Sequence, residues 1–367
     1  MSPLVLSRQN GTVTSLPADL PPLDEPAGPS VAEPLPADRP VRWGILATGK
    51  IATGFAQNLG LLPECEIAAV GARRLESAQA FAAEHGTPGT TKAYGDYAAL
   101  VEDPDVDVVY VATPHALHKE HVRMAFAAGK PVLCEKAITL TAADTEELVA
   151  EARERNLFLM EAMWMRCNPL VRRLQQLHAR GDLGEVRQVR ADLGFRVDKP
   201  ATDRLLDPAL GGGALLDMGV YPLTFASLFL GEPSEIHATG SLSDLGADLD
   251  LALSLGYPSG AVASLTSTMT AWSPRTASIA TSTGRIDVPE GFHHPTTATW
   301  TSAAGTETLH EDVIGSGLAN EAQEVVRCLR NGEVESPLVP LDDTVALMRQ
   351  MDRIRALLGV RYAADRG

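Results

Sequence analysis

The chain has 367 residues, 45% hydrophobic and 21% charged, which is enough apolar material for a sizeable core and enough length for two domains. Its formal net charge of −16, with no basic cluster longer than a pair of arginines, argues against nucleic acid as a partner. No apolar run reaches the roughly 20 residues that a membrane span needs, and the N-terminus lacks an apolar signal-peptide core. We therefore expect a cytoplasmic protein without a membrane partner.

The cysteines and histidines give no pattern of metal ligands. The four cysteines are widely separated and form no C-x-x-C pair, which favours reduced thiols over a disulfide framework; they are Cys65, Cys134, Cys167 and Cys328. The pair His293-His294 precedes Pro295 with no acidic or sulfur neighbour in the sequence. We expect no metal site.

Residues 1–40 differ in composition from the rest of the chain. They contain nine prolines and lack apolar periodicity, so they have little hydrophobic surface with which to offset the entropy of ordering. This composition predicts a disordered tail. The alternative is an arm that wraps a neighbouring subunit, because a Pro-rich extended segment loses little entropy when it docks.

Short apolar runs alternate with helical patterns between residues 41 and 163. The expected strands are Val41–Ala47, Glu66–Ala72, Val106–Ala112 and Val132–Glu135, and the expected helices are Gly49–Gly60, Leu75–His85, His115–Ala128 and Thr141–Arg155. This alternation predicts βαβ units and a parallel sheet with helices on its faces.

The pattern changes at residue 164. Stretches of period two, rich in Ser, Thr, Val and Ala, predict a large and mostly antiparallel sheet over residues 164–340; they are Glu185–Arg196, Glu235–Ser241, Asp250–Leu255, Ala261–Thr268 and Thr276–Ile286. Helical periodicity returns in Asn320–Leu329 and Leu341–Leu358. We expect residues 341–367 to form a terminal helix that packs back on the first domain.

The turn after the first predicted strand has the character of a dinucleotide-binding site. It reads Ala47-Thr48-Gly49-Lys50-Ile51-Ala52, with a glycine where the backbone must approach a pyrophosphate. The following helix directs its N-terminal amides at the phosphates. Because the G-x-G-x-x-G pattern has become A-x-G-x-x-A, a plain tight turn remains an alternative explanation.

The end of the second predicted strand indicates which dinucleotide is bound. An NAD site places an acidic residue there for the ribose 2′-hydroxyl, whereas a 2′-phosphate requires cations. This strand ends in Arg73-Arg74, followed by Ser77. One guanidinium can bind the phosphate while the other stacks on the adenine. We therefore predict NADP, with NAD as the weaker alternative.

Three residues in the middle of the chain suggest a reaction centre. Lys136 follows a predicted strand at the carboxyl edge of the parallel sheet, where doubly wound folds bind ligands. Asp217 and Tyr221 are four residues apart in a helix that follows three glycines, so both lie on one helix face. A tyrosine is too weak a base until a cation stabilises its phenolate, and Lys136 can provide that charge. The alternative is a buried tyrosine and an unrelated surface lysine.

Several motifs together resemble the glucose-fructose oxidoreductase and inositol dehydrogenase family (GFO/IDH/MocA). The matching segments are residues 43–52, 113–118, 129–136, 211–222 and 335–337. Residues 158–166 and Tyr221 resemble more narrowly the branch of dimeric dihydrodiol dehydrogenases and NADP-dependent xylose dehydrogenases. The resemblance extends from Val41 to Tyr362.

This resemblance implies a fold and roles for particular positions. It implies an N-terminal Rossmann domain with a doubly wound parallel sheet, followed by an α/β domain whose open, mostly antiparallel sheet forms the subunit interface of a homodimer or homotetramer. Tyr221 takes the place of the acid/base residue, Lys136 that of the lysine in the family's Glu-Lys-Pro motif, and Asp217 that of an orienting aspartate. The implied cofactor site also contains Thr113, His115, His118 and Glu135.

Some positions depart from the family pattern or have weaker support. Ala137 replaces the motif proline, so we expect the backbone geometry at Lys136 to differ. Candidate substrate contacts are Trp164, Arg166, Arg204 and Trp272, which offer an aromatic ring or a guanidinium to a sugar or diol.

The function predicted from these residues is hydride transfer between NADP and a carbon of a sugar, polyol or trans-dihydrodiol. A keto-sugar reductase of secondary metabolism and a dehydrogenase that retains its NADP between two sugars are alternative enzymes. A non-catalytic, NADP-sensing regulator is the alternative from another class. Because a sensor needs no proton donor, the presence of both Lys136 and Tyr221 favours an enzyme.

Overall fold

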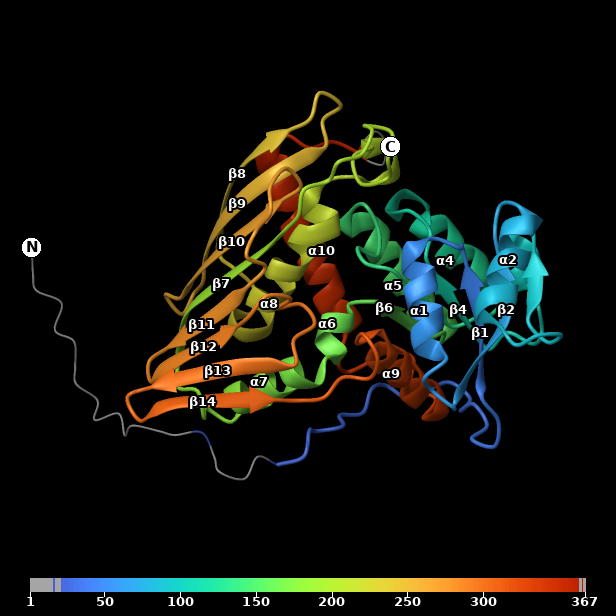
Figure 1. The fold of residues 1–367 in the computed structure, drawn as a ribbon, viewed down its shortest axis with the longest axis horizontal. Helices are drawn as coiled ribbons and strands as arrows, with labels where there is room; N and C mark the ends of the chain where they lie inside the picture. Colours follow the sequence, from blue (N-terminus) through green and yellow to red (C-terminus); the bar gives the residue numbers. More distant parts are fainter. Residues whose placement is uncertain (1–15, 17–20, 363–364, 366–367) are drawn as a thin grey trace, which may run out of the picture.

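The computed structural model describes residues 16, 21–362 and 365. It contains a six-stranded parallel sheet and an eight-stranded, mostly antiparallel sheet, each packed with helices, as the sequence predicts (Figure 1). In this part of the chain no helix is both long enough and apolar enough to cross a membrane.

The six-stranded sheet has the order β3-β2-β1-β4-β5-β6, with every neighbouring pair parallel. Its strands are Val41–Leu46 (β1), Cys65–Gly71 (β2), Lys92–Tyr94 (β3), Val108–Val111 (β4), Val132–Cys134 (β5) and Leu159–Glu161 (β6). Its helices are Lys50–Leu59 (α1), Leu75–His85 (α2), Tyr97–Val101 (α3), His115–Leu117 (η1), His118–Ala127 (α4) and Ala142–Arg155 (α5). The strand order reverses between β1 and β4, and ligands of doubly wound sheets bind at such a switch point.

The eight-stranded sheet has the order β14-β13-β12-β11-β7-β10-β9-β8, and β7 with β10 is its one parallel pair. Its strands are Val186–Gly194 (β7), Glu235–Leu242 (β8), Asp248–Gly256 (β9), Val262–Thr268 (β10), Ala277–Thr281 (β11), Gly284–Val288 (β12), Thr297–Ser302 (β13) and Gly305–His310 (β14). Along β10, Ala263 and Leu265 are buried while Ser264 and Thr266 are exposed. This alternation predicts one covered and one open face.

Helices cover one face of this sheet. They are Pro169–Ala179 (α7), Val220–Leu230 (α8) and Leu341–Leu358 (α10), which Figure 1 shows on the side that faces the parallel sheet. The remaining helical segments are Trp164–Cys167 (α6), Pro208–Leu210 (η2), Leu215–Gly219 (η3) and Leu318–Arg330 (α9). Helix α10 also contacts α5 and β6, so it joins the two halves of the molecule.

The predicted strand over residues 276–286 is wrong, because the chain reverses within it. Strands β11 and β12 form a hairpin, in which the Thr281 hydroxyl oxygen accepts hydrogen bonds from the amides of Thr283 and Gly284. The buried positions are Ala277 and Ile279 before the turn and Ile286 and Val288 after it, so the alternation changes phase across the turn, a signal that the prediction missed. Strands β3, β6, β13 and β14 are also absent from the sequence prediction, since they are either very short or rich in threonine.

Residues 21–40 are an extended segment that lies along α7 and α9, in contrast to the predicted tail. Arg173 and Gln176 of α7 donate hydrogen bonds to the carbonyls of Pro21 and Pro22, and Arg330 of α9 donates to the carbonyl of Arg39. Backbone hydrogen bonds to Leu329 and Gly332 add to these side-chain donors, so the segment docks without joining either sheet, and hydrophobic periodicity does not reveal such docking. Residues 1–15 and 17–20 of the predicted tail lie outside the described residues.

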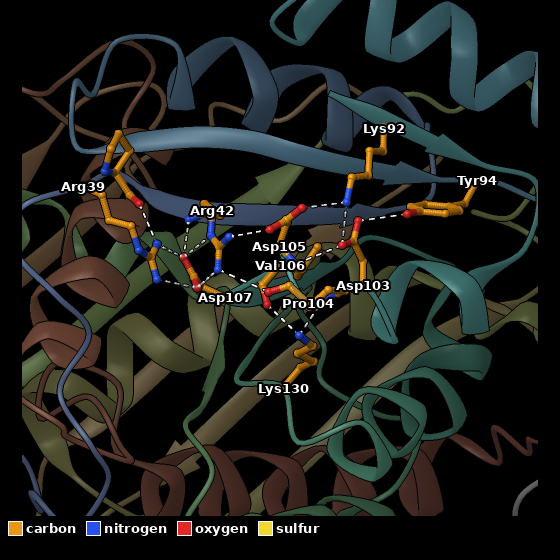
Figure 2. Close-up of polar contacts among 11 residues, drawn as sticks. Arg39, Arg42, Lys92, Tyr94, Asp103, Pro104, Asp105, Val106, Asp107 and Lys130 are labelled. Atoms are coloured by element: carbon orange, nitrogen blue, oxygen red, sulfur yellow. Dashed lines mark hydrogen bonds and ion pairs between the residues drawn. The ribbon is translucent and has the colours of Figure 1, made fainter. Parts of the chain in front are cut away.

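A network of charged side chains fastens this segment to the amino edge of the parallel sheet (Figure 2). Both carboxylate oxygens of Asp107 accept hydrogen bonds from Arg39, at 2.5 and 3.0 Å, and Asp107 also pairs with Arg42. Nearby, Lys92 pairs with Asp103 and Asp105. Burial raises the pKa of Asp107, but the hydrogen bonds from Arg39 and Arg42 outweigh it and hold the pKa at about 2.

We expect Asp107→Asn to lower the free energy of unfolding at pH 7 by about 2 kcal/mol. The Asp107 side chain is only 6% exposed, so solvent screens these pairs weakly. The pKa of Asp107 is lower in the folded state than the unfolded value of about 3.9. The stabilisation by its ion pairs is therefore complete above about pH 3.9 and is lost as the pH falls through about 2. Urea denaturation at pH 7 and pH 3 measures it.

Asp105→Asn is the matched control, because Asp105 lies in the same loop with a side chain that is 54% exposed. Water screens an exposed ion pair and leaves it little net stabilisation, so the control should lose less stability than Asp107→Asn. Equal losses in the two variants would contradict a specific role for the buried carboxylate.

Candidate active site

A cavity of about 950 Å³ lies at the carboxyl edge of the parallel sheet. Loops that follow β1, β2, β4 and β5 form one side of it, and η3 with α8 forms the other. Every residue predicted to bind the cofactor lines this cavity: Ala47, Thr48, Gly49, Lys50, Ile51, Arg73, Arg74, Ser77, Thr113, His115, His118, Glu135 and Lys136. The cavity thus combines the predicted dinucleotide residues with the predicted reaction centre.

The turn between β1 and α1 is shaped to receive a phosphate. Ala47 has a left-handed backbone, with φ of 91°, at the position where the common pattern has glycine. Gly49 precedes α1, and a Cβ atom there would meet no protein atom within 4 Å. No side chain caps α1, which leaves its first amides available to an anion. This geometry fits the pyrophosphate of a dinucleotide.

The opposite end of the cavity offers cations to a second anion. Arg73 and Arg74 are exposed at the end of β2, and Arg74 donates a hydrogen bond to Ser77 at 3.3 Å. Tyr97 of α3 lines the same cavity and packs edge-on against His121, with ring centroids 4.9 Å apart. No sequence pattern predicts the place of Tyr97, since α3 and β3 are too short to predict.

Lys136, Asp217 and Tyr221 meet at the inner end of the cavity. The Lys136 ammonium donates a hydrogen bond to the Asp217 carbonyl at 2.7 Å and lies 3.5 Å from its carboxylate. It also lies 5.0 Å from the centre of the Tyr221 ring. Arg204 approaches the same carboxylate at 3.6 Å.

The charges in this group favour an ionised lysine and aspartate. Burial lowers the pKa of Lys136, but the negative charges of Asp217, Tyr221 and Glu135 together outweigh it, so the net shift is upward. Burial raises the pKa of Asp217, but Lys136 and Arg204 outweigh it, so the net shift is downward. Burial raises the pKa of Tyr221 to about 12, although Lys136 and a hydrogen bond from Trp164 oppose it.

Aromatic side chains surround the Tyr221 hydroxyl. The Trp164 indole N–H donates a hydrogen bond to the hydroxyl oxygen at 2.7 Å. The His293 ring packs on Tyr221, with centroids 4.9 Å apart, and His294 stacks on Trp164 at 5.3 Å. Asn168 holds their loop by donating to the Pro295 carbonyl at 3.0 Å. No sequence pattern predicts these contacts of His293 and His294, which lie far along the chain from Trp164 and Tyr221.

The segment that carries Asp217 and Tyr221 begins as a π-helical turn. Residues Leu215–Gly219 form η3, and α8 follows directly with Tyr221 in its first turn. The predicted helix is therefore present, with a wider first turn. Both side chains face Lys136, which satisfies the prediction of a common face.

His115 and His118 contact the backbone on both sides of the reaction centre. The two ring nitrogens of His115 lie 3.1 and 3.0 Å from the carbonyls of Gly211 and Lys136, and those of His118 lie 3.0 and 2.7 Å from the carbonyls of Ala137 and Thr113. Burial lowers the pKa of both rings, that of His118 to about 3. A neutral imidazole donates from one nitrogen only, so each ring can donate a hydrogen bond to one of its two carbonyls and thereby hold the backbone beside Lys136. Their predicted contact with the cofactor stays a prediction.

The bond between Lys136 and Ala137 is cis, so the cis form is present with alanine in place of the motif proline.

The structure brings two of the four candidate substrate residues, Trp164 and Arg204, to the cavity. Arg166 does not reach it, because its guanidinium binds Asp343 and the Leu338 carbonyl. Trp272 does not line it and is 73% exposed on the loop between β10 and β11.

One cavity combines a turn that fits a phosphate, two exposed arginines and a lysine beside a buried tyrosine, an arrangement that fits an oxidoreductase with a nicotinamide dinucleotide. Residues 41–163 match the oxidoreductase family with an NAD-binding Rossmann fold, and residues 171–287 match the GFO/IDH/MocA C-terminal domain. The chain belongs to the GFO/IDH/MocA family and is an NAD(P)-dependent oxidoreductase.

Relatives and solved structures match nearly the full chain. The trans-1,2-dihydrobenzene-1,2-diol dehydrogenases of Bos taurus and Homo sapiens are each 37% identical, covering 89% of this chain and 99% of the relative. KijD10, a 3-ketoreductase from Actinomadura kijaniata solved with TDP-benzene and NADP, is 29% identical with a TM-score of 0.76, covering 88% of this chain and 99% of the other. An aldose-aldose oxidoreductase from Caulobacter crescentus shares the fold, with 24% identity and a TM-score of 0.79, covering 87% of this chain and 97% of the other.

Proposed function

We propose that this protein is an NADP-dependent dehydrogenase or reductase that acts on a sugar, polyol or trans-dihydrodiol, with Tyr221 as the general acid and base. One observation carries the proposal: the Lys136 ammonium lies 5.0 Å from the Tyr221 ring inside the cavity that holds the dinucleotide turn. The β1–α1 turn and the loops after β4 and β5 would hold NADP. When bound, NADP would supply or accept the hydride at C4 of its nicotinamide.

The chain's own residues move the proton. In the oxidising direction the Tyr221 phenolate takes the proton of the substrate hydroxyl, and in the reducing direction the phenol returns it. The Lys136 charge stabilises the phenolate, and the Asp217 backbone and carboxylate hold Lys136 in place. Because the Tyr221 oxygen already accepts a hydrogen bond from Trp164, the phenol proton is free to point at the substrate.

The lining of the inner cavity supports a cyclic substrate. Trp164, Leu210 and Leu318 offer apolar surface, and Arg204 offers hydrogen-bond donors at the rim. A sugar or dihydrodiol ring has an apolar face for the indole and hydroxyl groups for the polar side. The names of the dihydrodiol dehydrogenases and of the 3-ketoreductase support this range of substrates.

The test follows reduced nicotinamide absorbance with NADP⁺ or NAD⁺ and a panel of aldoses, inositols and trans-dihydrodiols, and with NADPH and keto-sugars in the reverse direction. Turnover of at least one member with NADP supports the proposal and names the substrate. NADP binding without turnover in either direction would favour the sensing regulator. Cofactor that survives gel filtration and oxidises one sugar while it reduces another would favour the enzyme that retains its NADP.

We expect Arg73→Gln or Arg74→Gln to raise the KM for NADP⁺ by about 10- to 100-fold, the value of a charge-assisted hydrogen bond to the 2′-phosphate. The KM for NAD⁺ should not rise, since NAD lacks that phosphate. Initial rates at saturating substrate measure both constants. Arg187→Gln, on an exposed position of β7, is the control, and a parallel rise for NAD⁺ would contradict the assignment.

We also propose a cytoplasmic homodimer or homotetramer that uses the open face of the eight-stranded sheet. Support comes from the alternation along β10 and from the helices that lie only on the inner face in the described part of the chain. Light scattering that returned a monomer would contradict the assembly, and recovery from a membrane fraction would contradict the location.

A further inference from the structure

Asp248 is a buried carboxylate that the proposed reaction does not use. It is the first residue of β9, its side chain is fully buried, and it does not line the cavity. A carboxylate in such a position loses its hydration and needs compensating hydrogen bonds. Its Oδ2 atom accepts the amide hydrogen of Leu215 at 2.5 Å, whereas Oδ1 has no partner among the described residues.

The Leu215 amide, which donates its hydrogen bond to Asp248, belongs to the first turn of η3. This turn has no side-chain cap of its own, because Ala214 occupies the capping position. The first N–H groups of a helix have no acceptor within the helix, so Asp248 supplies one from a strand of the neighbouring sheet. The chain enters η3 directly over the carboxylate: Gly213 has φ of 142°, and a Cβ atom there would collide with Oδ1.

The same short segment carries the reaction centre. The carbonyl of Asp217, in the middle of η3, accepts a hydrogen bond from the Lys136 ammonium at 2.7 Å. Tyr221 follows in the first turn of α8. A π-helical turn is rare and less favourable than an α-helical one, and it needs outside support. Asp248 holds the beginning of this turn and Lys136 holds its middle.

We propose that Asp248 is a positioning residue that fixes the π-helical turn and thereby aims Asp217 and Tyr221 at Lys136. The position of the backbone in η3 sets both the Lys136 anchor and the direction of the Tyr221 ring. Displacement of this turn would misalign Tyr221. It would not alter the dinucleotide turn, which follows β1 of the parallel sheet. The rate readout of this proposal rests on the proposed function, while its structural readout does not.

The test compares Asp248→Asn with Asp248→Ala. Asparagine keeps a side-chain oxygen that accepts the Leu215 amide, whereas alanine removes the acceptor. We expect Asp248→Ala to lower kcat by about 100-fold, the cost of misplacing a reacting group by about 1 Å, with no change in the Kd for NADP⁺. Asp248→Asn should retain a kcat close to that of the wild type. Gly213→Ala, which pushes against the carboxylate without removing it, should reproduce the loss.

Hydrogen–deuterium exchange of a peptide that covers residues 213–222 gives a readout that does not need turnover. Exchange should accelerate in Asp248→Ala and in Gly213→Ala but not in Asp248→Asn, at a temperature at which all three are folded. A wild-type kcat in Asp248→Ala or Gly213→Ala, an equal loss in Asp248→Asn, or a parallel loss of NADP⁺ affinity would overturn the positioning role. If the wild type turns over no substrate, the proposed function fails while the exchange experiment still tests Asp248.

Discussion

Tyr221→Phe is expected to lower kcat by about 10³-fold, within the range that a positioned acid or base contributes, and to leave the Kd for NADP⁺ unchanged. The substitution removes the oxygen that exchanges a proton with the substrate and keeps the ring that packs on His293 and Lys136. It also removes the acceptor of the Trp164 indole N–H. Steady-state rates with the substrate identified from the panel, together with cofactor titration by fluorescence, measure the two effects.

Tyr257→Phe is the matched control for this experiment. Tyr257 is buried, and its hydroxyl has no hydrogen-bond partner among the described residues, so the loss of that oxygen should leave kcat unchanged. A Tyr221→Phe variant that retained half of the wild-type kcat would remove Tyr221 from the proton transfer and leave the Lys136 ammonium as the next candidate.

The parts of the site that could be predicted from the sequence are those encoded by local spacing. Gly49 and Arg73 each follow a strand of the parallel sheet, and Lys136 follows another, so the topology alone brings them to one edge. Asp217 and Tyr221 lie one helical turn apart and reach the same edge through a single glycine-led segment. For such residues the strand or helix already determines the direction of the side chain.

The parts that could not be predicted depend on contacts between distant segments. His293 lies in a loop after β12, and Asp248 begins β9 of the eight-stranded sheet; both contact the segment that contains Tyr221. No spacing in the sequence relates these positions. The same holds for residues 21–40, where Arg173 and Arg330 bind backbone carbonyls of a segment without apolar periodicity. Hydrophobic patterns report which faces are buried, whereas these contacts are polar and specific to one pair of segments.

The pH dependence of oxidation should reveal the role of Lys136. The wild-type pKa of Tyr221, about 12, already includes the stabilisation of the phenolate by the Lys136 charge. Lys136→Met removes this charge, so the pKa of Tyr221 should rise by about 1 to 3 pH units. Less phenolate is then present at any given pH, and kcat for oxidation at pH 7 should fall by roughly 10- to 1000-fold.

The direction of the shift separates this role from a structural one. Across the accessible pH range, below the Tyr221 pKa, kcat should still rise with pH in Lys136→Met but reach any given rate at a pH about 1 to 3 units higher, because the base needs a higher pH to ionise, whereas misfolding would also raise the Kd for NADP⁺. Lys119→Met is the control, since Lys119 pairs with Asp144 and Glu147 on the outer helices α4 and α5. A rise that stayed in place or moved to lower pH would mean that Lys136 holds the backbone of η3 rather than the charge of the phenolate.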